Sequence, residues 1–143
     1  MKLKAILGAA LAGSLFVSSA LADTASGTWR LTSGKVTIRV SQCGGQNLCA
    51  TIVGLAQPLT KSGKVKVDKD NPNPALRNRP IIGLTVVNGM KPAGNNTWRG
   101  SIYNADDGRT YSGTATVAGN NLTISACVLG GLVCKKKHFV RVN

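Results

Sequence analysis

The sequence predicts an all-β protein folded as a single up-and-down antiparallel β-barrel of about eight strands. Apolar and polar residues alternate with a period of two from Thr28 onward, and no window shows a sustained helical stripe. Clusters of Gly, Asn and Asp separate the alternating segments, mostly at short intervals. Closing this meander into a barrel removes its exposed edges. A two-sheet β-sandwich is the alternative, because strand counting does not separate the two architectures.

Each expected strand ends at a turn signal. Gly44-Gly45 joins the second strand to the third, Asn88-Gly89 ends the fourth, and Gly130-Gly131 joins the last two. A short edge strand is also expected at 64–67, where Lys and Val alternate. The main strands are expected at residues 28–32, 35–41, 48–55, 81–88, 97–104, 109–118, 121–129 and 133–142.

The connection at 56–80 interrupts the series of strands and short turns, and it is much longer than an ordinary hairpin loop. Its prolines favour a rigid extended crossing, in which Arg77 and Arg79 point the same way. Their forked guanidinium groups suit carboxylate or phosphate, so they are candidates to hold an anionic ligand headgroup at the barrel mouth. The interpretation we favour is that they bond Asp68, Asp70 or loop carbonyls and fix the loop.

The first 22 residues have the features of a secretory signal. Lys2 and Lys4 precede a run of apolar and small residues, which ends at the small-x-small site Ala20-Leu21-Ala22. Glycines and serines interrupt this run, which argues against a membrane span. We expect cleavage after Ala22, a single barrel domain at 23–143, and a periplasmic or secreted location.

Four cysteines lie in the expected mature chain, and an exported protein meets conditions in which disulfides persist. Of the three possible connectivities we favour Cys43 with Cys49 and Cys127 with Cys134, because each pair would close a glycine-containing hairpin. The C-x5-C and C-x6-C spacings do not match the short spacing of structural zinc sites. We therefore expect two disulfides and no metal.

The composition is strongly basic, with 18 Lys and Arg against 5 acidic residues and a formal net charge of +13. Such a surface attracts polyanions, which in a cell envelope include anionic lipid and lipopolysaccharide. Nucleic-acid modules that stack single strands need aromatic residues interleaved with basic ones, and only Arg99 with Tyr103 hints at this. We expect no nucleic-acid partner.

Residues for catalysis are few. His138 follows a run of three lysines and is expected on the surface of a strand, and the acidic residues are all aspartates. Asp106 and Asp107 precede Gly108 as turn formers. The segment after Asp68 begins like a calcium-binding EF-hand loop, but its glycine and its closing glutamate are missing. We expect neither an enzyme nor a cofactor.

Two tryptophans and one tyrosine are candidates for structural or binding roles. Gly27-Thr28-Trp29 resembles the Gly-x-Trp at the start of the lipocalin barrel, and closure would bring Arg141 on the last strand beside it. A guanidinium over an indole face is a favourable contact, so Trp29 and Arg141 are expected to seal one end. Trp98 and Tyr103 lie on opposite faces of the strand at 97–104 and are the aromatic candidates for ligand contact.

Further motifs run through the chain: Gly27-x-Trp29, Cys43-Gly44-x4-Cys49, Ile52–Leu55, Asp70–Pro74, Leu76-Arg77-x-Arg79–Leu84, Trp98–Gly100, Ile102–Asn104, Asp107-Gly108-x-Thr110-Tyr111, Leu122-x-Ile124 and Val140–Val142. Taken together, these motifs resemble those of the uncharacterised exported bacterial family known as domain of unknown function 2147. The resemblance implies a lipocalin-like β-barrel and an exported location, and it implies no established activity. Cys134 lies outside the family's pattern, so the resemblance supports the first disulfide more than the second.

These observations predict a periplasmic, non-enzymatic barrel that binds a small hydrophobic or amphipathic ligand. Arg77, Arg79, Trp98 and Tyr103 are the candidate ligand-binding residues. The alternative is a cell-envelope protein whose basic surface binds anionic lipid or lipopolysaccharide. This second function predicts binding that weakens as salt is added.

Overall fold

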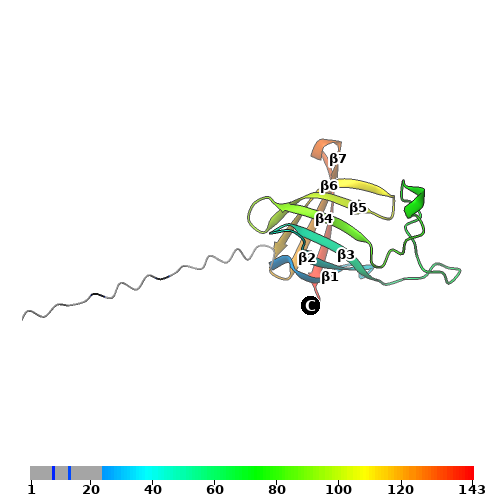
Figure 1. Cartoon of the computed structure of the whole chain (residues 1–143), viewed down its shortest axis with the longest axis horizontal. Helices are drawn as coiled ribbons and strands as arrows, with labels where there is room; N and C mark the ends of the chain where they lie inside the picture. The colour runs from blue at the N-terminus through cyan, green and yellow to red at the C-terminus, as the bar shows by residue number, and fades with distance from the viewer. Residues whose placement is uncertain (1–7, 9–12, 14–23) are drawn as a thin grey trace, which may run out of the picture.

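The structure, a computed structural model, describes residues 8, 13 and 24–143. Almost all of the expected secretory signal, including its cleavage site, therefore lies outside the described residues. In 24–143 the strands form one closed antiparallel barrel, in which each strand pairs with the next and β8 pairs with β1 (Figure 1). The predicted up-and-down barrel is confirmed, and the two-sheet sandwich is excluded. The strands are β1 (Gly27–Leu31), β2 (Val36–Gln42), β3 (Leu48–Leu55), β4 (Thr85–Pro92), β5 (Thr97–Asn104), β6 (Arg109–Ala118), β7 (Asn121–Val128) and β8 (Val133–Arg141).

The predicted bounds of the fourth strand are wrong. The sequence predicts a strand at 81–88, whereas β4 begins at Thr85 and ends at Pro92. Ile81 to Leu84 form a turn, in which the Leu84 N–H donates to the Ile81 carbonyl at 3.0 Å and Gly83 has a φ of 99°. Asn88-Gly89 lies inside β4, where the register to β5 shifts, and the hairpin turn comes later, at 93–96. The apolar character of Ile81 reflects packing against the core, and it does not indicate strand pairing.

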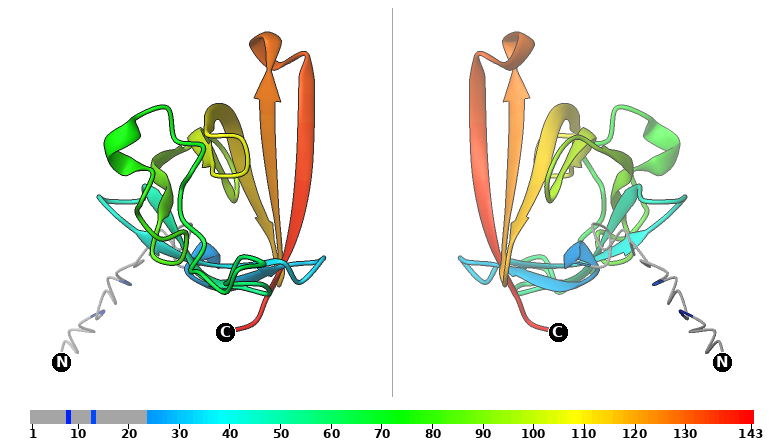
Figure 2. Two further views of the ribbon diagram at one scale, coloured as in Figure 1. Left: turned by 90° about the vertical axis from the view of Figure 1, so that its right-hand side faces the viewer. Right: turned by 90° about the vertical axis from the view of Figure 1, so that its left-hand side faces the viewer.

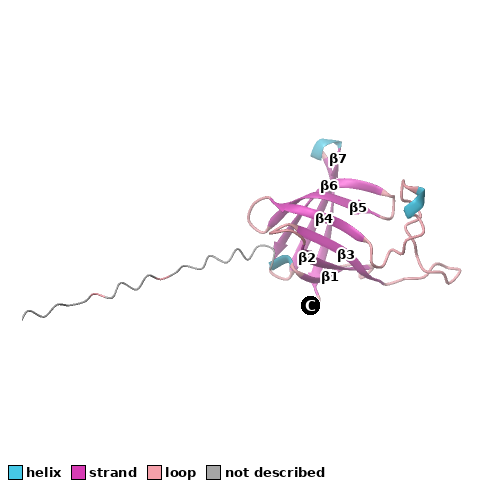
Figure 3. Cartoon of the chain, in the orientation of Figure 1, coloured by secondary structure: helices cyan, strands magenta, loops and turns pink. Residues whose placement is uncertain are grey.

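The long crossing between β3 and β4 holds a short 3₁₀ helix, η1 (Pro74–Leu76), and lies to one side of the barrel (Figure 1). The edge strand expected at 64–67 is absent from this described segment. Only isolated bridges form there, Leu59 with Val65 and Val67 with Pro80. Strands account for most of the other residues that the structure describes (Figure 3). Among the described residues, no helix combines the length and the apolarity needed to cross a membrane.

One end of the barrel is filled with side chains. Trp29 is completely buried there, and its indole N–H donates to the Ala25 carbonyl at 2.8 Å. The Arg141 guanidinium lies 4.2 Å from the centre of the Trp29 ring and donates to the carbonyls of Ser26 and Thr24. The residual void near Met90 is only about 20 Å³. This end therefore acts as the packed floor of the barrel.

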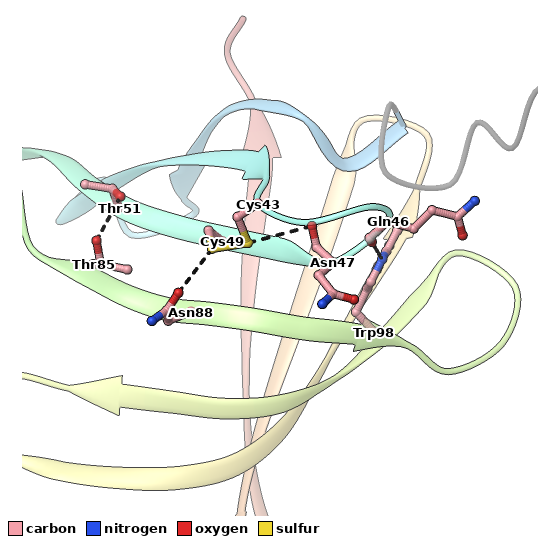
Figure 4. Close-up of a disulfide and its surroundings, with 8 residues drawn as sticks. All are labelled: Cys43, Gln46, Asn47, Cys49, Thr51, Thr85, Asn88 and Trp98. Atoms are coloured by element: carbon pink, nitrogen blue, oxygen red, sulfur yellow. Dashed lines mark hydrogen bonds between the residues drawn. A yellow bond between two sulfur atoms is a disulfide. The ribbon is translucent and has the colours of Figure 1, made fainter.

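The predicted disulfides are both present, Cys43–Cys49 and Cys127–Cys134. The first lies at the β2–β3 hairpin, whose Gln46 carbonyl accepts a 3.0 Å hydrogen bond from the indole of Trp98 (Figure 4). The second joins β7 to β8 just below their connection, the 3₁₀ turn η2 (Leu129–Gly131). Two disulfides fit an oxidising, extracytoplasmic compartment.

Candidate ligand-binding cavity

The other half of the barrel is hollow. A cavity of about 1120 Å³ opens at the end that carries the β1–β2, β3–β4, β5–β6 and β7–β8 connections. Its deeper walls are apolar because strand alternation turns one face of each strand inward. The apolar lining comes from Leu31, Val36, Ile38, Ala50, Ile52, Leu55, Ile81, Val86, Val87, Ile102, Ile124, Ala126, Val128, Val133 and Phe139.

Two lysines interrupt this apolar wall. Lys135 and Lys137 lie on the same face of β8 as buried Phe139 and both line the cavity. Across the strand pair, Lys137 lies opposite Ile124 and Lys135 opposite Ala126, which line it too. β1 pairs only with the last part of β8, so the lysine-bearing part has a strand neighbour on one side only. Both lysines thus line the cavity and are themselves exposed to solvent.

The mouth carries charges of both signs. Its further cations are Lys35, Lys66, Lys69 and Arg109, and its acids are Asp70, Asp106 and Asp107. Together with Lys135 and Lys137, cations outnumber acids in the lining. The cavity mouth is therefore net positive and attracts anions.

Asp107 is already engaged by its neighbours. The Tyr111 O–H and the backbone N–H of Arg109 both donate to its carboxylate. Burial raises the pKa of Asp107, but these hydrogen bonds and the charge of Arg109 lower it by more, so it lies below its ordinary value. The pKa of Tyr111 is raised, chiefly by its hydrogen bond to Asp107. This carboxylate therefore stays ionised at neutral pH.

Asp68 ties the long crossing to the barrel wall. It is completely buried, and one carboxylate oxygen accepts the Tyr103 O–H at 2.6 Å. The other accepts Asn71 Nδ2 at 2.8 Å and Arg79 Nε at 3.0 Å, and Arg79 Nη2 completes a forked ion pair at 3.0 Å. Tyr103 lies on β5, so this cluster joins residues 35 positions apart. It fixes the segment that contributes Lys66, Lys69 and Asp70 to the mouth.

The pKa values reflect this enclosure. Burial raises the pKa of the Asp68 carboxyl, but hydrogen bonds from Tyr103, Asn71 and Arg79 and the charge of Arg79 together lower it below its ordinary value. Burial and the bond to Asp68 raise the pKa of Tyr103. Asp68 is therefore held ionised and Tyr103 neutral.

A close backbone contact gives the crossing a second attachment. Gly108, in the β5–β6 turn, has a φ of 70°, and a Cβ atom there would lie 1.7 Å from the Asp70 carbonyl oxygen. Only glycine combines this conformation with this approach. The crossing therefore lies directly against the turn that supplies Asp106 and Asp107 to the mouth.

The four residues predicted to bind a ligand occupy different places. Tyr103 lines the cavity, although its hydroxyl is bonded to Asp68. Arg79 pairs with Asp68, and Arg77 donates to the Asn71 carbonyl at 2.7 Å, which matches the loop-fixing interpretation. Trp98 is buried at the packed end. Of the four, only Tyr103 belongs to the cavity lining that the structure describes.

Sequence reasoning missed Lys135 and Lys137. In the sequence they form part of the basic run before His138, which predicts a surface position. That histidine does lie on the outer face, exposed, with its Nδ1 3.3 Å from Thr123 Oγ1. The signal was present, because a period of two counted back from the apolar Phe139 turns both lysines inward.

The cavity offers little for acid–base or metal chemistry. Within the described lining there are three aspartates and no histidine. The part of the chain that the structure describes contains no group of three or more His, Cys, Asp or Glu side chains arranged to hold a metal ion. The arrangement suits binding: an apolar interior, a cationic wall and a fixed mouth.

Comparisons with known proteins agree with this architecture. A family described as uncharacterized protein conserved in bacteria (DUF2147) matches residues 27–141. Protein HP1028 from the human pathogen Helicobacter pylori, described as belonging to the lipocalin family, is similar in fold. Its TM-score is 0.69 and its identity 24%, over 82% of each chain. No curated protein shows significant similarity. The chain belongs to the DUF2147 family of uncharacterised bacterial proteins and has a lipocalin-like barrel.

Proposed function

We propose that this protein binds one small amphipathic molecule, with the apolar part inside the barrel and an anionic head beside Lys135 and Lys137. The main observation that supports this proposal is the cavity of about 1120 Å³, whose deeper walls are apolar and which has two lysines on one wall. Eight-stranded barrels either fill their interior with side chains or hold one small ligand, as lipocalins do. This barrel is filled with side chains at one end and has room for a small ligand at the other.

The size and the lining of the cavity set the ligand class. Pockets for small molecules typically have volumes of about 300–1,000 Å³ and mostly apolar walls. Each buried CH₂ group contributes about 0.8 kcal/mol, so a single acyl chain of moderate length gains enough to bind tightly. A bulky polar or polyanionic ligand would not match the apolar depth.

The lysines favour an anionic head over a neutral one. Lysine is a poor choice for a wall shared with Ile124 and Phe139 unless its ammonium has a partner or reaches solvent. Two neighbouring cations on one wall attract an anionic head, and because both lysines are exposed this attraction is moderate and weakens as salt is added. The acids of the mouth reduce this attraction without cancelling it, because cations outnumber them.

Export is part of the proposal. The leader-like first 22 residues and the two disulfides both favour a periplasmic or secreted protein. In such a compartment a barrel with an apolar cavity carries a sparingly soluble molecule through water. We infer a binding or carrier role and no catalysis.

Removing the two inward lysines is expected to weaken binding of an anionic amphiphile about tenfold, since each charge-assisted contact contributes roughly 1.5–3 kcal/mol and exposure reduces this. The measurement is titration of Lys135→Ala/Lys137→Ala with a dansyl-labelled undecanoic acid. Affinity for the methyl ester of the same probe should change little, because the ester has no charge to lose.

The matched control is Lys64→Ala/Lys91→Ala, which removes the same charge at two exposed lysines outside the cavity lining. It should bind the acid as the wild type does. Equal weakening in both double variants would reduce the effect to overall charge and overturn the assignment of the head site. Absence of binding by the wild type to either probe, together with no extractable ligand in mass spectrometry, would overturn the proposed function itself.

A further inference from the structure

The β7–β8 hairpin extends beyond the other strands (Figure 2). Its tip is apolar and exposed. We define the tip as Val128, Leu129, Leu132 and Val133, whose exposed fractions are 41%, 72%, 87% and 53%. Among the large hydrophobic residues that the structure describes, Leu132 and Leu129 are the most exposed. Scattered single exposed apolar residues are normal, but a group of four at one projecting turn marks an interaction site.

The tip is held in shape by the hairpin beneath it. Cys127 and Cys134 face each other across the strand pair and are joined by a disulfide, and Val128 pairs with Val133 directly above them. Leu129 has a φ of 54°, a left-handed conformation that glycine or asparagine adopts more readily. The chain thus places a leucine where the fold would favour another residue and where its side chain packs little. No described part of the chain covers this side chain, which is 72% exposed.

The charge next to the tip on β8 favours an anionic partner. Lys135, Lys136 and Lys137 follow the tip directly on β8, and the chain has no acidic residue after Asp107. At about 3.3 Å per residue, the lysines lie roughly 7–13 Å behind Val133 along the strand. Interfacial segments bury apolar residues about 5–10 Å into a membrane while lysines contact the headgroups. The spacing of apolar tip and lysines matches that layer structure.

We propose that the β7–β8 tip docks on an anionic lipid membrane, with Leu129 and Leu132 among the acyl chains and the lysines behind them near the headgroups, Lys136 from the outer face of β8 and Lys135 and Lys137 from the cavity face. A second copy of this chain is a poorer occupant, because tip-to-tip contact would bring two lysine triplets together. Val128 and Val133 also line the cavity, so docking places the cavity mouth against the bilayer. An amphipathic ligand would then enter or leave the barrel without crossing open water.

The test is flotation of the oxidised protein, expressed from its full-length gene, with phosphatidylcholine vesicles that contain or lack phosphatidylglycerol. Wild type should float with the anionic vesicles, and less so with neutral ones or at high salt. Leu129→Ser/Leu132→Ser should reduce the bound fraction about tenfold or more, because it removes the inserted apolar surface but keeps every charge. The matched control Leu59→Ser/Val65→Ser changes two exposed apolar residues on the crossing and should float like wild type.

A second measurement separates insertion from simple adsorption. The indole of Leu132→Trp should be quenched by lipids brominated high on the acyl chain when anionic vesicles are added. Equal flotation of both double serine variants, or no quenching, would overturn the proposal. Wild type that dimerises in solution while Leu129→Ser/Leu132→Ser is monomeric would assign the tip to a second copy and also overturn it. Probe binding to the cavity in solution is a separate readout, so the two proposals fail independently.

Discussion

Replacing Trp29 by alanine is expected to lower the free energy of unfolding by about 3–5 kcal/mol. The side chain is completely buried, its N–H is bonded to the Ala25 carbonyl, and its ring lies 4.2 Å from the guanidinium of Arg141. Alanine would leave a large void at the packed end, because a close-packed interior relaxes only in part. Urea unfolding with both disulfides intact measures the loss. With about 1–3 kcal/mol per molar urea, the midpoint should fall by at least about 1 M.

Two further variants separate the contribution of the buried ring from that of the indole hydrogen bond and from nonspecific effects of substitution. Trp29→Phe keeps an apolar ring but loses the hydrogen bond to Ala25 and weakens the contact with Arg141, so a loss of about 1–2 kcal/mol is expected. Leu59→Ala, at an exposed position on the crossing, should change the value by less than about 0.5 kcal/mol. If Trp29→Ala unfolded at the wild-type urea concentration, the packed end would not be what closes the barrel.

The barrel was predictable because strand order and pairing follow from local signals. Alternation marks the strands, and short turns force neighbours in sequence to pair. The disulfides followed from the same hairpins. β4 was misplaced because Ile81 and Ile82 look like the start of a strand, whereas Ile81 packs on the core from a turn and Ile82 is exposed. Two adjacent apolar residues therefore do not by themselves indicate a strand, because one of these packs on the core from a turn and the other faces solvent.

The site was harder to predict than the fold. Whether a barrel is hollow depends on how side chains from all strands fill one space, and strand count does not determine this. The pairing of Arg79 with Asp68 could be expected because both lie on the same crossing, but the Asp68–Tyr103 contact joins residues far apart in the chain, so the attachment of this cluster to β5 could not. The inward direction of Lys135 and Lys137 is the part of the site that could be predicted, because it follows from the period of two in β8 alone.

Replacing Asp68 by asparagine is expected to release the long crossing and to lower the free energy of unfolding by about 2–4 kcal/mol. Asparagine keeps the shape but replaces one acceptor by an N–H₂ group, which must face either the Tyr103 O–H or the donors of Asn71 and Arg79. Arg79 is 39% exposed and regains water, which keeps the loss below that of a fully buried pair. Limited trypsin digestion should show faster cleavage after Lys66, Lys69 and Arg77.

The contribution of Asp68 to stability should change with pH in a defined direction. The folded-state pKa of Asp68 lies below its unfolded value, which is about 3.9, so its stabilisation is fully present above that value and is lost as the pH falls through the folded-state pKa. The gap in unfolding free energy between wild type and Asp68→Asn should therefore be constant near neutral pH and shrink below about pH 4. Asp107 also has a lowered pKa, but it is present in both proteins and cancels in the difference.

Asp70→Asn is the matched control for Asp68→Asn, because Asp70 is an exposed aspartate two positions along the same crossing. It should leave stability within about 0.5 kcal/mol of wild type and trypsin cleavage unchanged. Asp68→Asn should in addition weaken ligand retention, since Lys66 and Lys69 lose their fixed place at the mouth. A crossing that stays protected from trypsin in Asp68→Asn, with a gap in stability that persists unchanged below pH 4, would mean that the Gly108 contact alone holds the segment. The Asp68 carboxylate would then not determine the shape of the cavity mouth, and the contact between Gly108 and Asp70 would determine it instead.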